Sequence, residues 1–365
     1  MIGSTKYGIY NKDVLLCTFE WDTENYICNV KQVAGMPAFA SSAQEWLDSR
    51  MPQKNREHIE RVLRLIGQST LKGVIDYTHG LSLTDTMWVK PSHLDLSWDA
   101  VSLYRHEFDE VIAHTAFDGG MYGRTLSTTS PEFTTGGTLP KCWVREGQTI
   151  VLVKGGTSGF SNTGNEPYSE VMASQILDRL AFEHVKYWLA NYRGRKVSKC
   201  KLLTSEQIGM VPIYKVFDSN SFEKIIFSAK ESGFGEGVAQ HLVLDYLTCN
   251  TDRHLGNLSV LFDNDSFELL KFAPIYDNGC AMLTYWNGQD SIAEYTAQLP
   301  PSCYSDFGWG VKRAFELWDK KDLREQVSQL IGFKFDRTQL GDFPDARIDK
   351  LEEWLQTRVE AFFQL

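Results

Sequence analysis

The spacing of apolar residues divides the chain into short strands and amphipathic helices. Residues 14–21 and 26–30 are apolar stretches on either side of a polar turn, which is typical of a β-hairpin. Further strands are expected where apolar and polar residues alternate, over 142–144, 149–153, 195–203 and 208–216. Helical spacing predicts helices over 42–47, 53–66, 166–180, 309–317, 321–331 and 346–363.

The pattern changes around the polar stretch 250–257. Before it, residues 237–247 have helical apolar spacing and no internal proline or glycine. After it, the apolar pattern resumes at 258–262 as a short strand. A turn, a second apolar segment and the polar turn 274–279 follow. The sequence therefore predicts two polar loops on either side of a hairpin.

These two loops carry the groups that phosphoryl transfer from ATP needs. Asp252 is followed five residues later by Asn257, and twenty residues beyond that by Asp277. In such a set one carboxylate orients the attacking hydroxyl, while an amide and a second carboxylate hold Mg²⁺ against the phosphates. The spacing resembles the catalytic loop and metal-binding aspartate of protein kinases, without the usual His-Arg-Asp order.

The order Asn-x-Asp-x-His-x-x-Asn followed by Tyr-Asp-x-Gly is similar to the HipA-like family of bacterial serine/threonine kinases. The resemblance implies that Asp252 is the catalytic carboxylate and that Asn257 and Asp277 are magnesium ligands. It also implies that Asn250 and His254 support the catalytic loop. A related Asp-Arg-His-x-x-Asn motif occurs in phosphatidylinositol kinases.

A Thr- and Gly-rich turn at 134–141 lies about a hundred residues before the catalytic loop. Gly136 and Gly137 let the backbone approach phosphate oxygens, and exposed N–H groups in such turns attract anions. The strand at 149–153 ends at Lys154, which can reach the α and β phosphates of ATP. The order of these features along the chain is that of a kinase.

The HipA-like family has a Ser/Thr- and Gly-rich loop ending in Pro-Lys at this place, so Thr138 is expected to join the two glycines in binding ATP. Leu139 stands where glutamine is common in the family. A hydroxyl residue of the family's loop can be self-phosphorylated, which ejects the loop and silences the enzyme. Thr134 is at the matching position, with Thr135 and Thr138 as alternatives, and a structural hydroxyl is the other interpretation.

Two glutamates are candidates for holding Lys154. Glu166 and Glu170 lie in the first turns of the helix predicted from 166 to 180, where acidic residues also suit the helix dipole. Kinases need a helix glutamate for the phosphate-binding lysine. Glu166 follows Asn165, as in the Asn-Glu pair of HipA-like sequences, and is slightly favoured. Leu203 and Ser205, where a kinase chain passes between lobes, are expected to bind adenine.

Composition restricts the class of protein. The formal charge of −10 and the pI near 5.4 argue against a broad nucleic-acid surface, so no direct nucleic-acid partner is expected. Seven cysteines without a Cys-x-x-Cys pair, together with the lack of a signal peptide, predict reduced thiols in the cytoplasm. No apolar run approaches membrane-spanning length, so no membrane partner is expected.

Together these features predict an α/β (α+β), two-lobed, protein-kinase-like fold. An N-terminal accessory subdomain is expected over 1–125, an N-lobe with the glycine loop over 126–206, and a mainly helical C-lobe over 207–365. The predicted activity is that of an ATP- and Mg²⁺-dependent serine/threonine protein kinase, acting as a toxin or effector on a protein hydroxyl. A separate antitoxin or regulatory protein is the expected further partner.

Three alternatives stay open at this point. The Asp-Arg-His-x-x-Asn motif also suits a lipid or small-molecule kinase, although no basic amphipathic membrane segment accompanies it. A second alternative is a non-catalytic interaction module, which would have no need to keep Lys154, Asp252, Asn257 and Asp277. The third is transfer of a nucleotidyl group from an inverted ATP.

Overall fold

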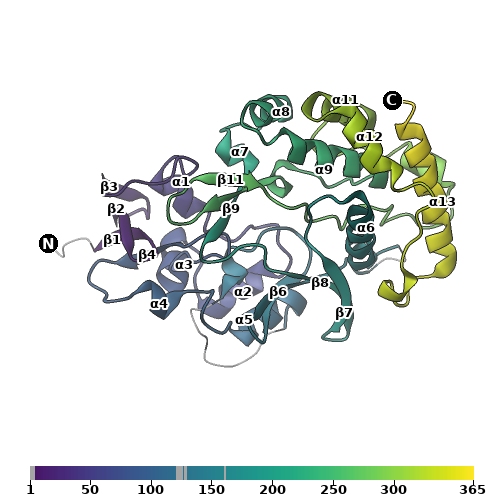
Figure 1. Cartoon of the computed structure of the whole chain (residues 1–365). Helices are drawn as coiled ribbons and strands as arrows, with labels where there is room; N and C mark the ends of the chain where they lie inside the picture. Colours follow the sequence, from purple (N-terminus) through teal and green to yellow (C-terminus); the bar gives the residue numbers. More distant parts are fainter. Residues whose placement is uncertain (1–4, 121–125, 127–129, 160–161) are drawn as a thin grey trace. The chain divides into compact units, whose positions relative to one another are not determined.

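The structure is a computed structural model that describes residues 5–120, 126, 130–159 and 162–365. The chain forms two compact units, each built from several segments (Figure 1). The first unit comprises Met1–Val153, Leu202–Val211 and Leu261–Leu270. The second comprises Lys154–Lys201, Pro212–Val260 and Lys271–Leu365. The expected three-part division, with boundaries near 125 and 206, stays a prediction.

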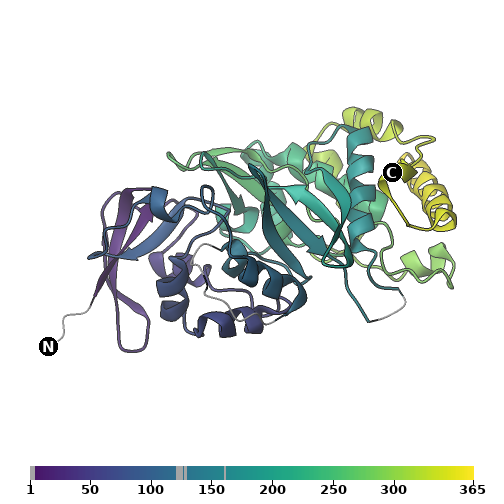
Figure 2. The same ribbon diagram turned by 90° about the horizontal axis from the view of Figure 1, so that it is seen from below.

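An antiparallel sheet of order β3-β2-β1-β4 opens the first unit, and Figure 2 shows its first strands side by side. The strands are β1 (Lys6–Asn11), β2 (Val14–Trp21), β3 (Ile27–Gln32) and β4 (Met87–Pro91). Alternate residues such as Ile9, Phe19 and Val89 are buried against Leu47 and Phe267. The predicted hairpin is confirmed, with Thr18 opposite Lys31.

Short helices and a hairpin complete the first unit. Its α-helices are α1 (Ala43–Asp48), α2 (Ile59–Ile66), α3 (Leu71–Thr78), α4 (Trp98–Val101) and α5 (Glu110–Asp118). Ile59 and Val62 of α2 pack with Ile112 and Ala116 of α5 and with Phe133. The 3₁₀ helix η1 (Pro131–Phe133) precedes the glycine turn, and β5 (Lys141–Glu146) follows as the hydrogen-bonded neighbour of β6 (Thr149–Gly155).

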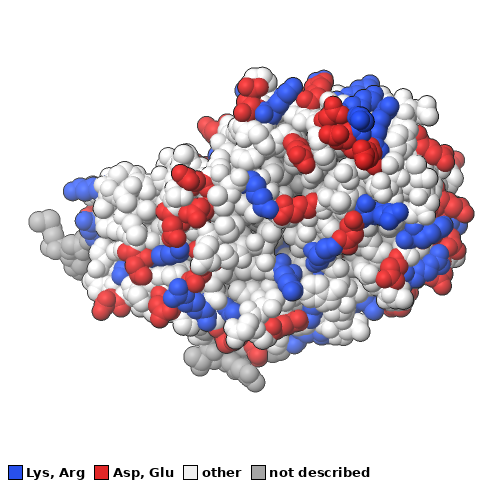
Figure 3. All heavy atoms as spheres, in the orientation of Figure 1, with Lys and Arg blue, Asp and Glu red and all other residues white. Residues whose placement is uncertain are grey.

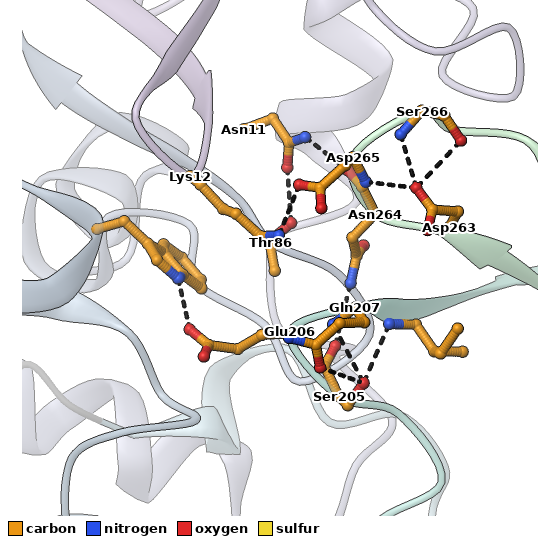
Figure 4. Close-up of polar contacts among 12 residues, drawn as sticks. Asn11, Lys12, Thr86, Ser205, Glu206, Gln207, Asp263, Asn264, Asp265 and Ser266 are labelled. Carbon is orange, nitrogen blue, oxygen red and sulfur yellow. Dashed lines mark hydrogen bonds and ion pairs between the residues drawn. The ribbon is translucent and has the colours of Figure 1, made fainter.

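Two later segments of the chain belong to the first unit and are held there by polar contacts (Figure 4). Asn11 donates from Nδ2 to the carbonyl of Asn264 at 2.6 Å, and Lys12 pairs with Asp265 at 2.6 Å. Glu206 accepts from Trp98 Nε1 at 2.6 Å and from Arg105 Nε at 2.8 Å. Asn11 and Lys12 thus contact residues that follow them by 253 positions, and Trp98 and Arg105 contact Glu206, which follows them by 108 and 101 positions.

These segments contribute to a three-stranded sheet of order β11-β10-β9. Its strands are β9 (Ile208–Pro212), β10 (Ser259–Asp263) and β11 (Leu269–Phe272). Asp263 closes the turn between β10 and β11, because its Oδ1 accepts from the backbone N–H groups of Asp265 and Ser266 (Figure 4).

The second unit is mainly helical. It contains the antiparallel pair β7 (Tyr187–Tyr192) and β8 (Arg195–Lys201), with Tyr187 opposite Cys200. Its helices are α6 (Glu166–Leu180), α7 (Ile213–Val216), α8 (Phe222–Glu231), α9 (Gly235–Thr248), η2 (Leu255–Asn257), α10 (Ile292–Thr296), α11 (Phe307–Leu317), α12 (Lys320–Ser328), η3 (Arg337–Gln339) and α13 (Asp345–Phe362). Helix α9 packs against α8, α11 and α13, and it immediately precedes the polar loop at 250–257.

Two predicted elements are wrong in their extent. The helix expected over 53–66 begins at Ile59, because His58 adopts a left-handed conformation at the N-cap. The strand expected over 208–216 ends at Pro212, and residues 213–216 form the helical turn α7. Pro212 is the N-cap of that turn, and the N–H of Ile213 donates to Leu258.

Acidic and basic side chains are interspersed on the face drawn in Figure 3. The seven cysteines are free thiols, in agreement with the sequence-based expectation. Within the described ranges, every helix is too short or too polar to cross a membrane.

Candidate functional site

Lys154 lies near the end of β6, is the first residue of the second unit, and forms ion pairs with two carboxylates of the same unit. Its Nζ pairs with Glu170 of α6, and it lies 2.6 Å from Oδ1 of Asp277 in the loop after β11. The side chains of Lys154 and Glu170 are 6% and 1% exposed, whereas Asp277 is 32% exposed. The lysine therefore joins a fully buried carboxylate to one that solvent can reach.

Burial and neighbouring charges shift the pKa values of Lys154 and Glu170 in opposite directions. Burial alone would lower the pKa of Lys154, but the negative charges of Asp277 and Glu170 outweigh it and raise the pKa above its ordinary value. Burial raises the pKa of Glu170, and the positive charge of Lys154 works against that rise. We interpret the cluster as a lysine that stays protonated and is held in place by both acids.

Helix α6 positions Glu170. Pro167 lies in its first turn and Arg179 in its last, and Ala181 ends the helix in a left-handed conformation. Oε2 of Glu170 also accepts from the backbone N–H of Asn278 at 2.8 Å. The carboxylate therefore contacts both Lys154 and the loop that carries Asp277.

The slight preference for Glu166 as the partner of Lys154 is wrong. One turn earlier on α6, Glu166 accepts from the backbone N–H of Thr157 at 3.2 Å and from the hydroxyl of Tyr285 at 3.1 Å. It lies at the start of the helix and closes the loop before it. Glu170 is four residues further along the same helix and reaches Lys154.

The loop after α9 carries the predicted catalytic residues and is braced by its own amides. Cys249 ends α9 with a φ of +48°, and Oδ1 of Asn250 accepts from the N–H of Asp252 at 3.1 Å. Nδ2 of Asn257 donates to the carbonyl of Asp252 at 3.2 Å. His254 is the N-cap of η2, and its Nδ1 accepts from the N–H of Gly256. The side chain of Asp252 is exposed.

Sequence reasoning missed Arg253, which ties this loop to its surroundings. Its guanidinium is 1% exposed and pairs through Nε with Asp245 of α9 at 3.2 Å. It also donates to the carbonyl of Tyr276 at 3.1 Å and to Oδ1 of Asn278 at 2.6 Å. Burial would lower the pKa of Arg253, but the charge of Asp245 raises it. The only signal for this role was the position of Arg253 beside Asp252.

Asp277 adopts a left-handed conformation with a φ of +60°, which aspartate tolerates better than most residues. Its backbone N–H donates to the hydroxyl of Tyr187 at 3.3 Å. The next residue, Asn278, accepts on its backbone carbonyl from the hydroxyl of Ser169 at 2.7 Å. Strand β7, helix α6 and Arg253 thus fix the backbone on both sides of the Asp277 carboxylate.

The donor set suits Mg²⁺ that is also held by phosphates. Oδ1 of Asn257 and the carboxylate of Asp277 offer oxygen donors, and Mg²⁺ commonly takes one or two carboxylates together with phosphate and water oxygens. The part of the chain that the structure describes contains no group of three or more His, Cys, Asp or Glu residues that could hold a metal ion alone. A magnesium ion here would therefore need the phosphates as well.

The predicted glycine loop belongs to the first unit. The Thr134 hydroxyl donates to the carbonyl of Leu81 at 3.2 Å, and the Thr135 hydroxyl donates to the carbonyl of Pro131 at 2.8 Å. Thr138 is the exposed one of the three threonines. The N–H of Gly137, which has a φ of +88°, donates to Oε1 of Gln53 at 3.0 Å. Roles in nucleotide binding and in phosphorylation stay predictions for Gly136, Gly137 and these threonines.

The predicted adenine-binding residues Leu203 and Ser205 also lie in the first unit. The backbone N–H of Ser205 donates to Ile208 at 2.9 Å, and its carbonyl accepts from Nδ2 of Asn264 at 3.0 Å (Figure 4). A role of Leu203 and Ser205 in binding adenine stays a prediction.

No family model and no curated protein sequence matches the chain. Among solved structures, HipA of Shewanella oneidensis MR-1, in a toxin–antitoxin complex with HipB and operator DNA, is similar with a TM-score of 0.56 and 13% identity. The similarity covers 98% of this chain and 98% of that one. The proinflammatory kinase CtkA of Helicobacter pylori has a TM-score of 0.46 and 17% identity, covering 61% of this chain and 93% of that one.

The protein therefore has a kinase-like fold, as the sequence predicted. More narrowly, it has the HipA-like form of that fold, and the likeness extends over the N-terminal region as well as the region that carries the motifs. Because the HipA structure contains operator DNA, the expectation that nucleic acid is not a partner is not supported.

Proposed function

We propose that this protein is an ATP- and Mg²⁺-dependent protein kinase of the HipA-like type that acts on serine or threonine hydroxyls. The proposal depends above all on the buried contact of Lys154 with Glu170 and Asp277. A lysine held by a helix glutamate beside a metal-binding aspartate is a recurring part of kinase sites. The HipA-like fold supports the same class of activity.

Each side chain of the site would have a separate role in phosphoryl transfer. Lys154 would bind the α and β phosphates, while Glu170 keeps its ammonium in place. Asn257 and Asp277 would hold Mg²⁺, which neutralises charge on the phosphates when it is bound. The exposed carboxylate of Asp252 would accept a hydrogen bond from the substrate hydroxyl and orient its oxygen towards the γ-phosphorus.

Regulation and partners follow from the same proposal. Self-phosphorylation at Thr134, Thr135 or Thr138 would change the glycine loop by adding a charged group to it. The HipA structure contains HipB and operator DNA, so we propose a separate antitoxin protein as a partner of a cytoplasmic toxin or effector kinase. DNA contact would then come with that complex.

The test is transfer of label from γ-labelled ATP in the presence of Mg²⁺, with the Asp252→Asn variant beside the wild type. The proposal expects label on serine or threonine of the wild-type protein or of an added protein substrate, and none with the variant. Asp265→Asn, an exposed aspartate paired with Lys12, is the matched control and should keep the activity.

The melting temperature separates the alternatives. Mg²⁺-ATP should raise Tm for the wild type and for Asp252→Asn, because ligands that bind the native state stabilise it and Asp252 is not a nucleotide ligand in this proposal. If neither label nor a Tm shift is seen, the protein is a non-catalytic interaction module. Label on lipid or a small molecule, and none on protein, would favour the other kinase classes.

A further inference from the structure

The side-chain amide of Gln53 lies against the glycine pair of the predicted phosphate-binding loop. Its Oε1 accepts from the backbone N–H of Gly137 at 3.0 Å. A Cβ atom added to Gly136 would lie 3.3 Å from Nε2 of Gln53, so the amide also adjoins that residue. Gln53 and both glycines belong to the first unit.

The rest of the segment Gln53–Glu57 binds the same loop at neighbouring positions. The backbone N–H of Glu57 donates to the carbonyl of Thr138 at 3.0 Å. The guanidinium of Arg56 donates to the carbonyls of Thr135 at 3.4 Å and Lys141 at 2.9 Å. A segment of the N-terminal region therefore contacts the loop before, within and after its glycines.

These contacts differ in strength because they differ in burial. Arg56 pairs with Glu132, and both side chains are at most 1% exposed. Removing one partner of such a buried pair is strongly destabilising, so this contact is a permanent anchor. Gln53 is exposed, and a neutral hydrogen bond at the surface contributes little net stability. The glycine end of the loop can therefore be released while its base stays fixed.

The surroundings of the Gly137 N–H suit an anion. Gly137 has a φ of +88°, and the ammonium of Lys141 occupies the space where a Cβ atom would be. A phosphate oxygen beside this cation is a charged acceptor, and charge-assisted hydrogen bonds are about twice as strong as neutral ones. Phosphate should therefore displace the Gln53 carbonyl oxygen from the same N–H.

We infer that Gln53 is a positioning residue of the glycine loop that holds the Gly137 N–H in the nucleotide-free protein and yields it to a nucleotide phosphate. The inference rests on the proposed function, because it takes this loop as the phosphate-binding loop. The segment Gln53–Glu57 of the N-terminal region would then contribute to nucleotide binding by positioning this loop.

Two variants with opposite expected effects test the inference. Gln53→Ala removes the competing acceptor, so hydrogen exchange at Gly137 should become faster, and the Kd for Mg²⁺-ATP should fall, each by about twofold to tenfold. Gln53→Glu places a carboxylate at the same position, which binds the N–H more strongly and repels phosphate. Exchange should then slow, and the Kd should rise by about tenfold.

Exchange would be measured by mass spectrometry on overlapping peptides that resolve Gly137, and affinity by calorimetry with Mg²⁺-ATP. Asn55→Ala, at an exposed residue of the same segment, is the matched control and should change neither quantity. Equal weakening of ATP binding in both Gln53 variants, or unchanged exchange in Gln53→Ala, overturns the inference alone. Failure of the wild type to bind Mg²⁺-ATP overturns the proposed function with it, although exchange at Gly137 still reports the hydrogen bond.

Discussion

Arg253 donates a 2.6 Å hydrogen bond to Oδ1 of Asn278, and these two residues directly follow Asp252 and Asp277. The bond joins the loop after α9 to the loop after β11. Because Arg253 also pairs with Asp245, both loops are tied to helix α9. The buried guanidinium of Arg253 thus helps to set the separation of the two proposed catalytic and metal-binding carboxylates, together with the backbone hydrogen bond from Thr251 to Cys280.

Replacing Asn278 by alanine should loosen this connection without removing either carboxylate. The variant leaves one N–H of a buried guanidinium without its acceptor, which should lower the free energy of unfolding by about 1–3 kcal/mol. Misplacement of Asp252 relative to Asp277 should lower kcat by about tenfold to a hundredfold. Urea denaturation and steady-state phosphate transfer measure the two effects.

The matched control is Tyr304→Phe. It removes a hydroxyl that donates to Asp245 at 3.3 Å, but it leaves the contacts of Arg253 with both loops intact. This variant should keep a kcat within about threefold of wild type, since it loses one weak hydrogen bond outside the loops. If Asn278→Ala and Tyr304→Phe lower kcat equally, the connection between the loops has no special role in positioning.

Glu170 and Glu166 give a second matched pair, one helical turn apart. Glu170→Gln removes one of the two negative charges that hold Lys154, so it should weaken binding of Mg²⁺-ATP by about tenfold or more and lower stability by about 1–3 kcal/mol. Glu166→Gln leaves Lys154 with both acids and should keep the affinity within about threefold of wild type. If Glu166→Gln weakens binding of Mg²⁺-ATP and Glu170→Gln does not, Glu166 is the glutamate that supports Lys154.

The residues that spacing could identify are those that interrupt an apolar pattern. Asp252, Asn257 and Asp277 lie in polar loops beside regular elements, and Lys154 ends an apolar strand, so each was visible in the sequence. The fold class followed from the same pattern, since a helix before the first loop and a hairpin after it are the order of a kinase. The structure contains α9, β10 and β11 where that order requires them.

Other residues could not be identified in this way. Nearly every side chain of α6 is buried, so periodicity could not distinguish Glu166 from Glu170. Arg253 and Asn278 look like ordinary members of polar loops until the structure brings them together across 25 residues. Asn11 and Asn264 are 253 residues apart, and no local pattern records their contact.

That distant contact gives a prediction for the first unit. Asn11 is buried, donates to the carbonyl of Asn264 at 2.6 Å and accepts from the hydroxyl of Thr86 at 2.6 Å (Figure 4). Asn11→Ala leaves two buried groups without partners and should lower the free energy of unfolding by about 2–6 kcal/mol, at about 1–3 kcal/mol for each group. Chemical denaturation of the full chain measures the loss.

The neighbouring residue is the matched control. Lys12 pairs with Asp265, whose side chain is 67% exposed, and exposed ion pairs are worth about 0–1 kcal/mol. Lys12→Ala should therefore cost less than Asn11→Ala, and high salt should remove the difference between Lys12→Ala and wild type. A Lys12→Ala loss as large as that of Asn11→Ala would show that charge, and not the buried amide, holds residues 261–270 to the N-terminal sheet.

His241 of α9 should make the protein less stable in mild acid. Its ring is buried, Nδ1 lies 2.8 Å from the carbonyl of Gly237, and burial followed by the charge of Arg253 lowers the pKa of His241 to about 3. In the unfolded chain the pKa is near 6.5. Between these values the unfolded state binds more protons, so stability falls as pH falls. At pH 5 the loss from this residue should be about 2 kcal/mol relative to neutral pH.

The comparison of wild type with His241→Gln isolates this effect. Burial raises the pKa of Asp245 to about 6. Over part of the same pH range Asp245 therefore makes the folded state more stable as pH falls, which is opposite to the effect of His241. Asp245 is present in both proteins, so its effect is the same in each. Urea unfolding at pH 7, 6 and 5 gives the free energy of unfolding of both proteins at each pH. The two curves of free energy against pH should converge as pH falls, because only the wild type contains the buried imidazole that the folded state keeps neutral. Parallel curves would mean that His241 takes up its proton equally in the folded and unfolded states, and that the ring is not held neutral beside Arg253.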